Sequence, residues 1–326
     1  MILVTGGAGY IGSHMVQALV RAGQPVLVLD NLSTGHAEAV PEGLLIRGDV
    51  GDAALLERLF TSHPIKAVIH FAGFIQVGES VADPGRYYQN NVSATQVLID
   101  ALCRHQILRL VFSSSAAVYG APVSSPILET AALAPINPYG RSKAFVEAML
   151  QDYARAYGLR SVALRYFNAA GADPGGQLGE CHEPETHLIP RVLRVATGED
   201  AAITVFGTDY ATSDGSCIRD YVHVADLCSA HHLALQYLEH AEGASAFNLG
   251  NGAGHSVLEV IAVARSVTGR PIPVMEAPRR AGDPAVLVAS SAQAQAVLGW
   301  RPRHADLSGI LQDAWRWQNR VRTPGA

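Results

Sequence analysis

The chain has 326 residues, of which 48% are hydrophobic, so it is long enough for one large domain or two coupled domains with a substantial core. Its formal net charge of -5 and pI near 6.2 argue against a nucleic-acid-binding surface, which needs clustered lysine and arginine. Four cysteines without a CxxC pair, and a start at Met1-Ile2-Leu3 with no signal-peptide pattern or later membrane span, predict a cytoplasmic protein without membrane contact.

Short apolar runs alternate with longer helical patterns through the first half of the chain. Six runs have the composition of buried parallel strands: Ile2 to Val4, Val26 to Leu29, Leu44 to Ile46, Ala67 to Ile69, Leu110 to Phe112 and Ser161 to Leu164. The segments between them are long enough for crossover helices. This alternation predicts an α/β fold with a doubly wound parallel sheet and right-handed connections over about residues 1 to 165.

The character of the sequence changes from about Asn168. The Gly, Pro and Asp content of residues 169–176 breaks the regular alternation. We expect residues 168–326 to form mainly a smaller, mixed α/β substrate lobe. Helix and strand patterns return later, at Val222 to Tyr237, Phe247 to Gly250 and Ser256 to Thr268. We therefore expect the two lobes to interleave, with the first domain resumed near residues 218–248.

The first predicted strand leads into a glycine-rich loop, in which Gly6, Gly9 and Gly12 precede the helical run Ser13 to Arg21. Such glycines allow a tight turn, and the helix N-terminus presents free N–H groups to a pyrophosphate. Asp30 follows at the distance expected for a carboxylate that binds ribose hydroxyls and repels a 2′-phosphate. The pattern predicts a Rossmann domain over residues 1–167 that binds NAD rather than NADP. A glycine-rich turn without a ligand is the alternative.

Three further segments follow predicted strands and therefore meet at the same sheet edge: Gly48-Asp49-Val50, His70-Phe71-Ala72-Gly73 and Phe112-Ser113-Ser114-Ser115. The first two point toward a cleft for adenine and nicotinamide. A serine of the third segment, placed opposite Tyr139, could hydrogen-bond a reacting hydroxyl. A simple strand-end turn explains the serines equally well unless Tyr139 and Lys143 join them.

Tyr139 and Lys143 are four residues apart in a segment that Pro138 suits as a helix start, so their side chains share one helix face. A fixed ammonium and a nearby cofactor charge would lower the pKa of the phenol. A shift of about 3 units corresponds to roughly 4 kcal/mol in favour of the phenolate. Taken alone, this spacing is more often an exposed helix face.

These features together resemble the extended short-chain dehydrogenase/reductase superfamily and, within it, the UDP-glucose 4-epimerase family. The resemblance covers nearly the whole chain. It rests on Gly6-Gly7-Ala8-Gly9-Tyr10-Ile11-Gly12, Leu29-Asp30-Asn31, Val77-Gly78-Glu79-Ser80, Tyr87-Tyr88-Gln89-Asn90-Asn91, Ser113-Ser114-Ser115, Tyr139 with Lys143, Arg165-Tyr166-Phe167-Asn168, Val205-Phe206-Gly207, Arg219-Asp220-Tyr221-Val222-His223, and Ala277-Pro278-Arg279-Arg280 continuing to Gly282-Asp283.

The resemblance implies Tyr139 as catalytic base, Lys143 as its acidifier and a ligand of the nicotinamide ribose, and Ser115 as partner of the sugar hydroxyl. The implied NAD contacts, beside Tyr139, Lys143 and the glycines Gly6, Gly9 and Gly12, are Tyr10, Ile11, Asp30, Asn31, Leu32, Ser33, Thr34, Gly35, Asp49, Val50, Phe71, Ala72, Gly73, Ile75, Asn90 and Phe167. The implied UDP-sugar contacts are Ser115, Ala116, Ala117, Tyr139, Asn168, His187, Leu188, Val205, Phe206, Gly207, Arg219, Arg280 and Asp283.

Three positions depart from the family pattern. Ile75 stands where some members carry a lysine near the cofactor phosphates, and His187 stands where some carry an asparagine beside the sugar. Leu287 occupies the position of a pocket-wall residue that is large in some members and small in those that accept N-acetylated sugars. UDP-N-acetylglucosamine and a UDP-pentose therefore stay open as substrates.

Three other functions compete with C4 epimerisation of a UDP-hexose. A nucleotide-sugar dehydratase shares the fold, but that family has Asp-Glu where this chain has Ser114-Ser115. A dehydrogenase that releases NADH is disfavoured on family grounds. A non-catalytic NAD-sensing regulator need not retain Ser115, Tyr139 and Lys143 together.

The remaining expectations concern metals and assembly. Cys181, His182 and His187 are irregularly spaced in a Pro-containing loop, so we interpret them as unrelated polar surface and expect no metal. His231-His232 has the same interpretation. The resemblance implies a homodimer through the helical segments Asp83 to Cys103 and Tyr139 to Tyr157.

Overall fold

The computed structural model describes residues 1–122, 124–280 and 283–322, so Gly282 of the last quoted motif lies outside the described residues. Its main sheet has seven parallel strands in the order β11-β6-β5-β4-β1-β2-β3. Their bounds are β1 Ile2–Thr5, β2 Val26–Asp30, β3 Leu45–Arg47, β4 Ala67–His70, β5 Arg109–Ser113, β6 Arg160–Tyr166 and β11 Ala244–Leu249.

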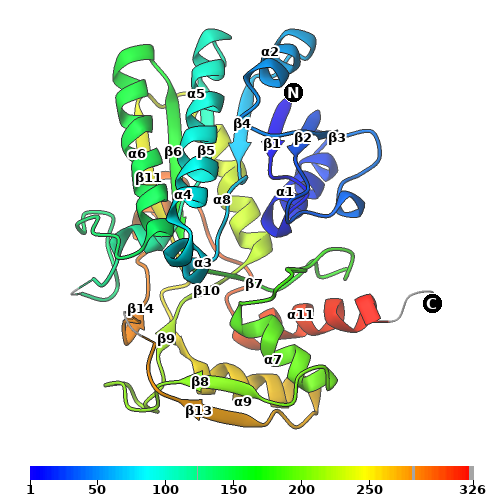
Figure 1. Cartoon of the computed structure of the whole chain (residues 1–326), viewed down its shortest axis with the longest axis vertical. Helices are drawn as coiled ribbons and strands as arrows, with labels where there is room; N and C mark the ends of the chain where they lie inside the picture. The colour runs from blue at the N-terminus through cyan, green and yellow to red at the C-terminus, as the bar shows by residue number, and fades with distance from the viewer. Residues whose placement is uncertain (123, 281–282, 323–326) are drawn as a thin grey trace.

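Helices cover both faces of this sheet (Figure 1). Alternate strand residues point to opposite faces, so Val4 and Val28 enter one core while Leu3 and Leu29 enter the other. The first core lies under α1 Tyr10–Arg21, α8 Val224–Tyr237 and α10 Ala292–Val297. The second lies under α2 Ala53–Ser62, α5 Ala94–Arg104 and α6 Pro138–Tyr157. This is the doubly wound arrangement.

The structure confirms the predicted fold class, and a strand overlaps each of the six predicted runs. The strand predicted at Phe247 is part of β11, which pairs with β6 at the edge of the main sheet. Helix α8 packs against α1 on one face of the same sheet. Residues far apart in the sequence thus belong to one layered unit.

The second lobe contains short sheets and three larger helices, seen below the main sheet in Figure 1. Helices α7 Leu188–Thr197, α9 Val257–Thr268 and α11 Leu307–Arg322 enclose its core with the strand pair β8 and β13. The lobe's strands are β7 Asn168–Ala170, β8 Ile203–Phe206, β9 Ile218–Arg219, β10 Tyr221–His223, β12 His255–Ser256, β13 Val274–Ala277 and β14 Val286–Leu287.

Helix α6 carries the predicted Tyr139 and Lys143 pair. It begins where Asn137 accepts the backbone N–H of Gly140 and Pro138 occupies the first turn, and it ends at Gly158 in the left-handed conformation. The start of α6 lies beside the short 3-10 turn Ala116–Tyr119, which follows β5.

Among the described residues, no helix has the length and apolar character that crossing a membrane requires.

A buried ion pair fixes α6 to β6. Glu147 and Arg165 have side chains 4% and 6% exposed, and the Nη2 to Oε2 distance is 2.5 Å. Ser114 donates its hydroxyl to the same carboxylate, and Arg165 also donates to the hydroxyl of Tyr119. Because both charges are paired and hydrogen-bonded, this burial is tolerated, whereas removing one partner would leave an uncompensated charge.

Short helical elements complete the first domain. Helix α3 spans Val77–Ala82, α4 spans Pro84–Tyr88, and a π-turn over Gln89–Ser93 joins α4 to α5. A second 3-10 turn lies at Ala37–Ala39. A π-turn places one extra residue in a helical turn and often marks a functional site.

Candidate active site

The glycine loop after β1 folds back tightly on the start of α1. Gly6 has φ +72°, and a Cβ added there would lie 2.5 Å from the backbone nitrogen of Ala72. A Cβ on Gly12 would lie 2.1 Å from the carbonyl oxygen of Gly6. No larger residue fits these two positions, so the loop and the N-terminus of α1 form the close backbone cradle that a pyrophosphate requires. The residues present therefore fit a dinucleotide.

Asp30, the last residue of β2, lies at the edge of this cradle. Its carboxylate accepts the backbone N–H groups of Ala8 and Leu32, each at 2.9 Å, and the residue is 8% exposed. Asn31 donates to the carboxylate of Asp49 at 2.8 Å, which joins the ends of β2 and β3. Asp30 is thus fixed before any ribose binds, with the predicted Ser33, Thr34 and Gly35 in the loop that follows.

The loop after β4 supplies the other predicted cofactor positions. Phe71 lies against the ring of His231 of α8 at 4.6 Å, and His231 is fully buried, so its interpretation as polar surface is wrong. Ile75 is 38% exposed. The side chain of Val50 lies in the core with β1 and α2.

Ser115, Tyr139 and Lys143 come together at the carboxyl end of β5. A hydrogen bond joins Ser115 to Tyr139, and the Ser115 hydroxyl also accepts the N–H of Ala117 at 3.1 Å. The Lys143 ammonium lies 5.9 Å from the centroid of the Tyr139 ring and donates to the carbonyl oxygen of Ser113 at 2.8 Å. The structure thus assembles the three residues that the sequence predicts to be catalytic.

The electrostatics of this trio differ from the expectation that Lys143 acidifies Tyr139. Burial raises the pKa of Tyr139, and the hydrogen bond with Ser115 opposes that effect. Burial lowers the pKa of Lys143 to about 8, against the attraction of Glu147. The physical reason for the difference is desolvation, which disfavours the phenolate and the ammonium alike. A lowered Tyr139 pKa therefore requires a further positive charge at the site.

Asn91, the neighbour of the predicted Asn90, has a structural role that its sequence position did not indicate. The π-turn directs Asn91 inward, where it is 3% exposed. Its amide accepts the N–H of Phe74 at 2.8 Å and donates to the carbonyl of Phe74 at 2.9 Å and to the hydroxyl of Ser142 at 3.2 Å. Asn91 thus holds the loop after β4 against α6, and Asn90 donates to its side-chain oxygen at 2.8 Å.

Glu147 was also missed, although a sequence signal exists. It lies four residues after Lys143 on the same face of α6 and favours the charged form of that lysine. Its charge is already paired with Arg165, so it is not a free acid. The hydroxyl of Ser114 points to Glu147 rather than toward Tyr139.

The predicted diphosphate ligands belong to the second lobe. Arg219 donates to the carboxylate of Asp283 at 3.2 Å and to two backbone carbonyls, so its guanidinium is already positioned. The Arg280 guanidinium lies over the ring of Phe206 at 3.9 Å. Asn168 donates to the carbonyl oxygen of Asp220 at 3.1 Å. Two cations and an amide thus come from separate elements of this lobe.

Other predicted substrate positions are divided between core and site. Val205 is 1% exposed and belongs to the lobe core; Gly207 follows with φ +81°. Ala116 lies in a small apolar cluster against which Phe167 and Leu287 pack. Ala117 is in the same 3-10 turn. Leu287 therefore lies next to the segment that carries Ser115, as a pocket-wall residue must.

His187 and Leu188 form the junction between a long loop and α7. His187 is the N-cap residue of α7 and Leu188 its first residue. The ring of His187 is not an isolated polar group, because its Nδ1 contacts the carboxylate of Glu180. His182 lies beside the same carboxylate at 3.1 Å. The interpretation of these histidines as unrelated polar surface is therefore wrong, although Cys181 does not join them.

Comparison with known proteins identifies the family. The model of the NAD dependent epimerase/dehydratase family matches residues 2–250. The chain belongs to this family. The chain is also similar to a UDP-glucose 4-epimerase of Halalkalibacterium halodurans, with 54% identity over 97% of this chain and 95% of the relative. The predicted superfamily and the NAD cofactor are thereby confirmed.

Solved structures of epimerases agree closely with this fold. The chain is similar to a UDP-glucose 4-epimerase from Brucella ovis in complex with NAD, with a TM-score of 0.94, 51% identity and coverage of 96% and 97% of the two chains. It is also similar to a UDP-glucose-4-epimerase from Stenotrophomonas maltophila with bound NAD and formylated UDP-arabinopyranose. The TM-score there is 0.95, with 41% identity and 98% coverage of both chains.

The lowered pKa of Lys143 makes a prediction about stability. A lysine that titrates at about 8 when folded and at 10.5 otherwise disfavours folding at pH 7 by about 3 kcal/mol. Between these two values the unfolded chain binds more protons, so this penalty disappears as the pH rises. We expect the free energy of unfolding of Lys143→Met, relative to wild type, to fall by about 2–3 kcal/mol between pH 7 and pH 10. Urea denaturation at several pH values measures it.

The chain contains one other lysine, Lys66, which is exposed. Lys66→Met is the matched control, because it makes the same substitution at an exposed position. A flat difference for Lys143→Met would contradict the predicted desolvation of the ammonium.

Proposed function

We propose that this chain interconverts the C4 epimers of a UDP-hexose, UDP-glucose and UDP-galactose, through a transient 4-keto sugar while NAD stays bound. The observation that carries the proposal is the trio of Ser115, Tyr139 and Lys143 at the edge where the nucleotide cradle also lies. The chain aligns with the named UDP-glucose 4-epimerases over nearly their whole length.

Tyr139 is proposed to take the proton of the C4 hydroxyl and to return it when the ketone is reduced. Bound NAD supplies the hydride acceptor and donor at C4. Ser115, which already bonds Tyr139, would hold the sugar hydroxyl and the phenol oxygen in line. Burial makes the Tyr139 phenol resist ionisation, so the positive charges of Lys143 and the oxidised cofactor must both favour the phenolate.

Inversion at C4 requires the 4-keto sugar to present its other face, so the nucleotide must be held more firmly than the hexose. Arg219 and Arg280 suit this task, because a guanidinium pairs with a diphosphate through charge-assisted hydrogen bonds. Arg219 is 13% exposed at its side chain and is oriented by Asp283. We further propose that residues 1–167, with 218–248, bind NAD and that 168–326 mainly bind the UDP-sugar.

The arrangement favours epimerisation over dehydration. Elimination of water needs an acid and a base beside the sugar. The carboxylate behind this site, Glu147, is neutralised by Arg165 and hydrogen-bonded by Ser114. Ser114 and Ser115 have no carboxyl group themselves, and the neighbouring Glu147 is not free to act as an acid or a base.

The choice of hexose depends on Leu287, which packs near Ala116 and Phe167. A leucine is smaller than a tyrosine and larger than a cysteine or serine, so the wall it forms is intermediate. The Stenotrophomonas relative binds a formylated UDP-pentose, which supports testing a UDP-pentose beside UDP-galactose and UDP-N-acetylgalactosamine.

We also infer a cytoplasmic location from the reduced cysteines.

The main test replaces the proposed base. We expect Tyr139→Phe to keep its bound NAD and lose at least about 100-fold in kcat with UDP-galactose, because only the proton-transfer group is removed. Product identity, NAD content and NADH release are followed together. Tyr157→Phe is the matched control, since it lies on the same helix about 27 Å away and is 60% exposed.

Near-normal turnover in Tyr139→Phe would remove that residue from the mechanism. Release of NADH in proportion to product by the wild-type enzyme would instead favour a dehydrogenase and refute the epimerase proposal.

We also propose that two copies pair through α6 and the α4–α5 segment. Phe145 on the outer side of α6 is 50% exposed and packs on Tyr88 at 6.0 Å, and Val81 of α3 is 63% exposed nearby. These apolar side chains lie opposite the buried face that carries Lys143. A second copy would remove them from water.

We expect Phe145→Glu to halve the mass measured by light scattering, because an interface core rejects an unpaired carboxylate. Val297→Glu on α10 is the control, since Val297 is 47% exposed on the other face of the sheet. A monomeric wild-type protein, or an unchanged mass for Phe145→Glu, would contradict this assembly.

A further inference from the structure

The loop between β7 and α7 brings four metal-ligating side chains together. Glu180, His182, Glu185 and His187 each offer one ligand atom, and these four atoms all lie within 4.8 Å of one another. Two are carboxylate oxygens and two are imidazole nitrogens. The catalytic steps proposed above use neither carboxylate.

The distances suit four ligands around one small cation. The Nδ1 atom of His182 is 3.1 Å from Oε1 of Glu180 and 3.9 Å from Oε2 of Glu185, and Nδ1 of His187 contacts the same Glu180 oxygen. Ligand atoms about 2.0–2.2 Å from a tetrahedral Zn²⁺ lie about 3.4 Å from one another. The observed separations are on either side of this value, so small side-chain shifts would complete the tetrahedron.

The charges in the cluster suit a cation. The side chains of Glu180 and Glu185 are only 6% and 5% exposed. In the part of the chain that the structure describes, neither carboxylate has a lysine or arginine within salt-bridge distance, and their ionic partners are imidazoles. Burying two carboxylates beside each other is unfavourable unless positive charge compensates them. One divalent cation with two neutral imidazoles would balance both charges.

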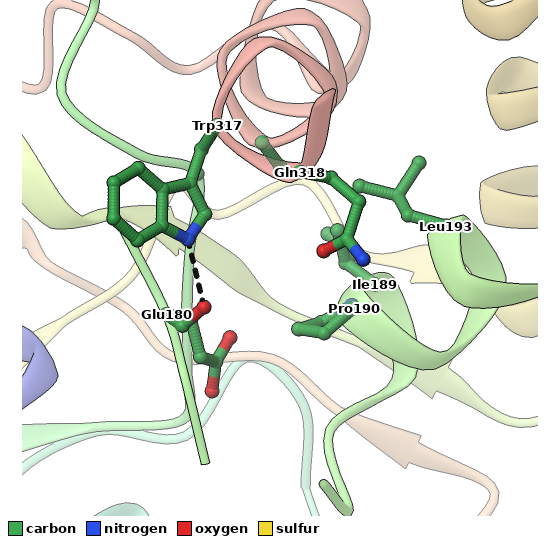
Figure 2. A pocket seen from close by; sticks show the side chains of 8 residues that line it. Glu180, Ile189, Pro190, Leu193, Trp317 and Gln318 are labelled. Carbon is green, nitrogen blue, oxygen red and sulfur yellow. Dashed lines mark hydrogen bonds between the residues drawn. The ribbon is translucent and has the colours of Figure 1, made fainter. Parts of the chain in front are cut away.

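Neighbouring groups hold the ligands in place through hydrogen bonds, as the partners of ligands do in metal sites. Trp317 of α11 donates its indole N–H to the backbone carbonyl of Glu180 at 2.9 Å, and in Figure 2 the Glu180 carboxylate points away from that ring. One oxygen of Glu185 accepts the N–H groups of Thr186 and His187, at 2.7 and 2.8 Å, which leaves the other oxygen facing His182.

We propose that Glu180, His182, Glu185 and His187 form a structural Zn²⁺ site. The mixed imidazole and carboxylate set favours zinc over Mg²⁺ or Ca²⁺, which prefer oxygen ligands. Four protein ligands close the coordination sphere, as in structural rather than catalytic zinc sites.

The position of the cluster explains what such a metal would do. The ring of His182 meets Tyr10 edge-on at 6.4 Å, and the Tyr10 hydroxyl donates to the carbonyl of Gly171 at 2.6 Å. Tyr10 begins α1 at the cofactor cradle, and His187 ends the loop at the predicted substrate residues. The metal would therefore fasten the loop 171–187 between the cofactor and substrate lobes.

The test measures metal directly and does not depend on epimerase activity. The full-length protein is stripped with a chelator, dialysed and titrated with Zn²⁺ or Co²⁺. We expect about one equivalent to bind, with the intense visible spectrum of tetrahedral Co²⁺. Saturating Zn²⁺ should raise the Tm by about 3–5 °C. Glu180→Gln and His182→Ala should each weaken binding at least about tenfold.

Two variants in the same loop are matched controls. Glu183→Gln removes an exposed carboxylate outside the cluster, and Cys181→Ser removes an exposed thiol, so both should bind metal as wild type does. Failure of the stripped wild-type protein to take up metal would overturn the proposal. A six-coordinate Co²⁺ spectrum, or equal loss of binding in Glu183→Gln, would also overturn it. The wild-type titration decides the matter even if a ligand variant does not fold.

Discussion

The contact between the Lys143 ammonium and the Ser113 carbonyl joins α6 to the end of β5, and the active-site geometry depends on it. It places a buried cation where a strand edge and a helix start meet, so that Ser115 and Tyr139 are held within hydrogen-bond reach. The ion pair of Glu147 with Arg165 supports the same helix one turn later. The site therefore depends on buried charged groups, and the loss of their hydration disfavours folding.

The positions of the three catalytic side chains and their protonation states depend on different features of the structure. The backbone elements that carry the trio are fixed by the cores on both faces of the sheet. The protonation states instead depend on how much positive charge gathers near Tyr139, since burial favours its neutral form. A cofactor that changes its own charge during turnover would then change the basicity of Tyr139 without moving the backbone.

Much of the fold and part of the site could be predicted from sequence because the relevant signals are local. Apolar runs marked the strands, glycines at 6, 9 and 12 marked the cradle, and a four-residue spacing marked Tyr139 and Lys143. The inward turn of Asn91 depends on a π-turn, and the meeting of Glu180 with Glu185 depends on loop closure. The direction of the Tyr139 pKa depends on burial. None of these three features can be predicted from the spacing of residues along the chain.

The composition of the chain gives Lys143 one more consequence. Lys66 and Lys143 are its two lysines, one in solvent and the other in the catalytic centre. Arginine fills the other 22 basic positions, because the chain has 24 lysines and arginines in total. Side-chain amine chemistry is thus restricted to two places of very different accessibility. A reagent specific for primary amines would report, by where it attaches, whether the active site has opened.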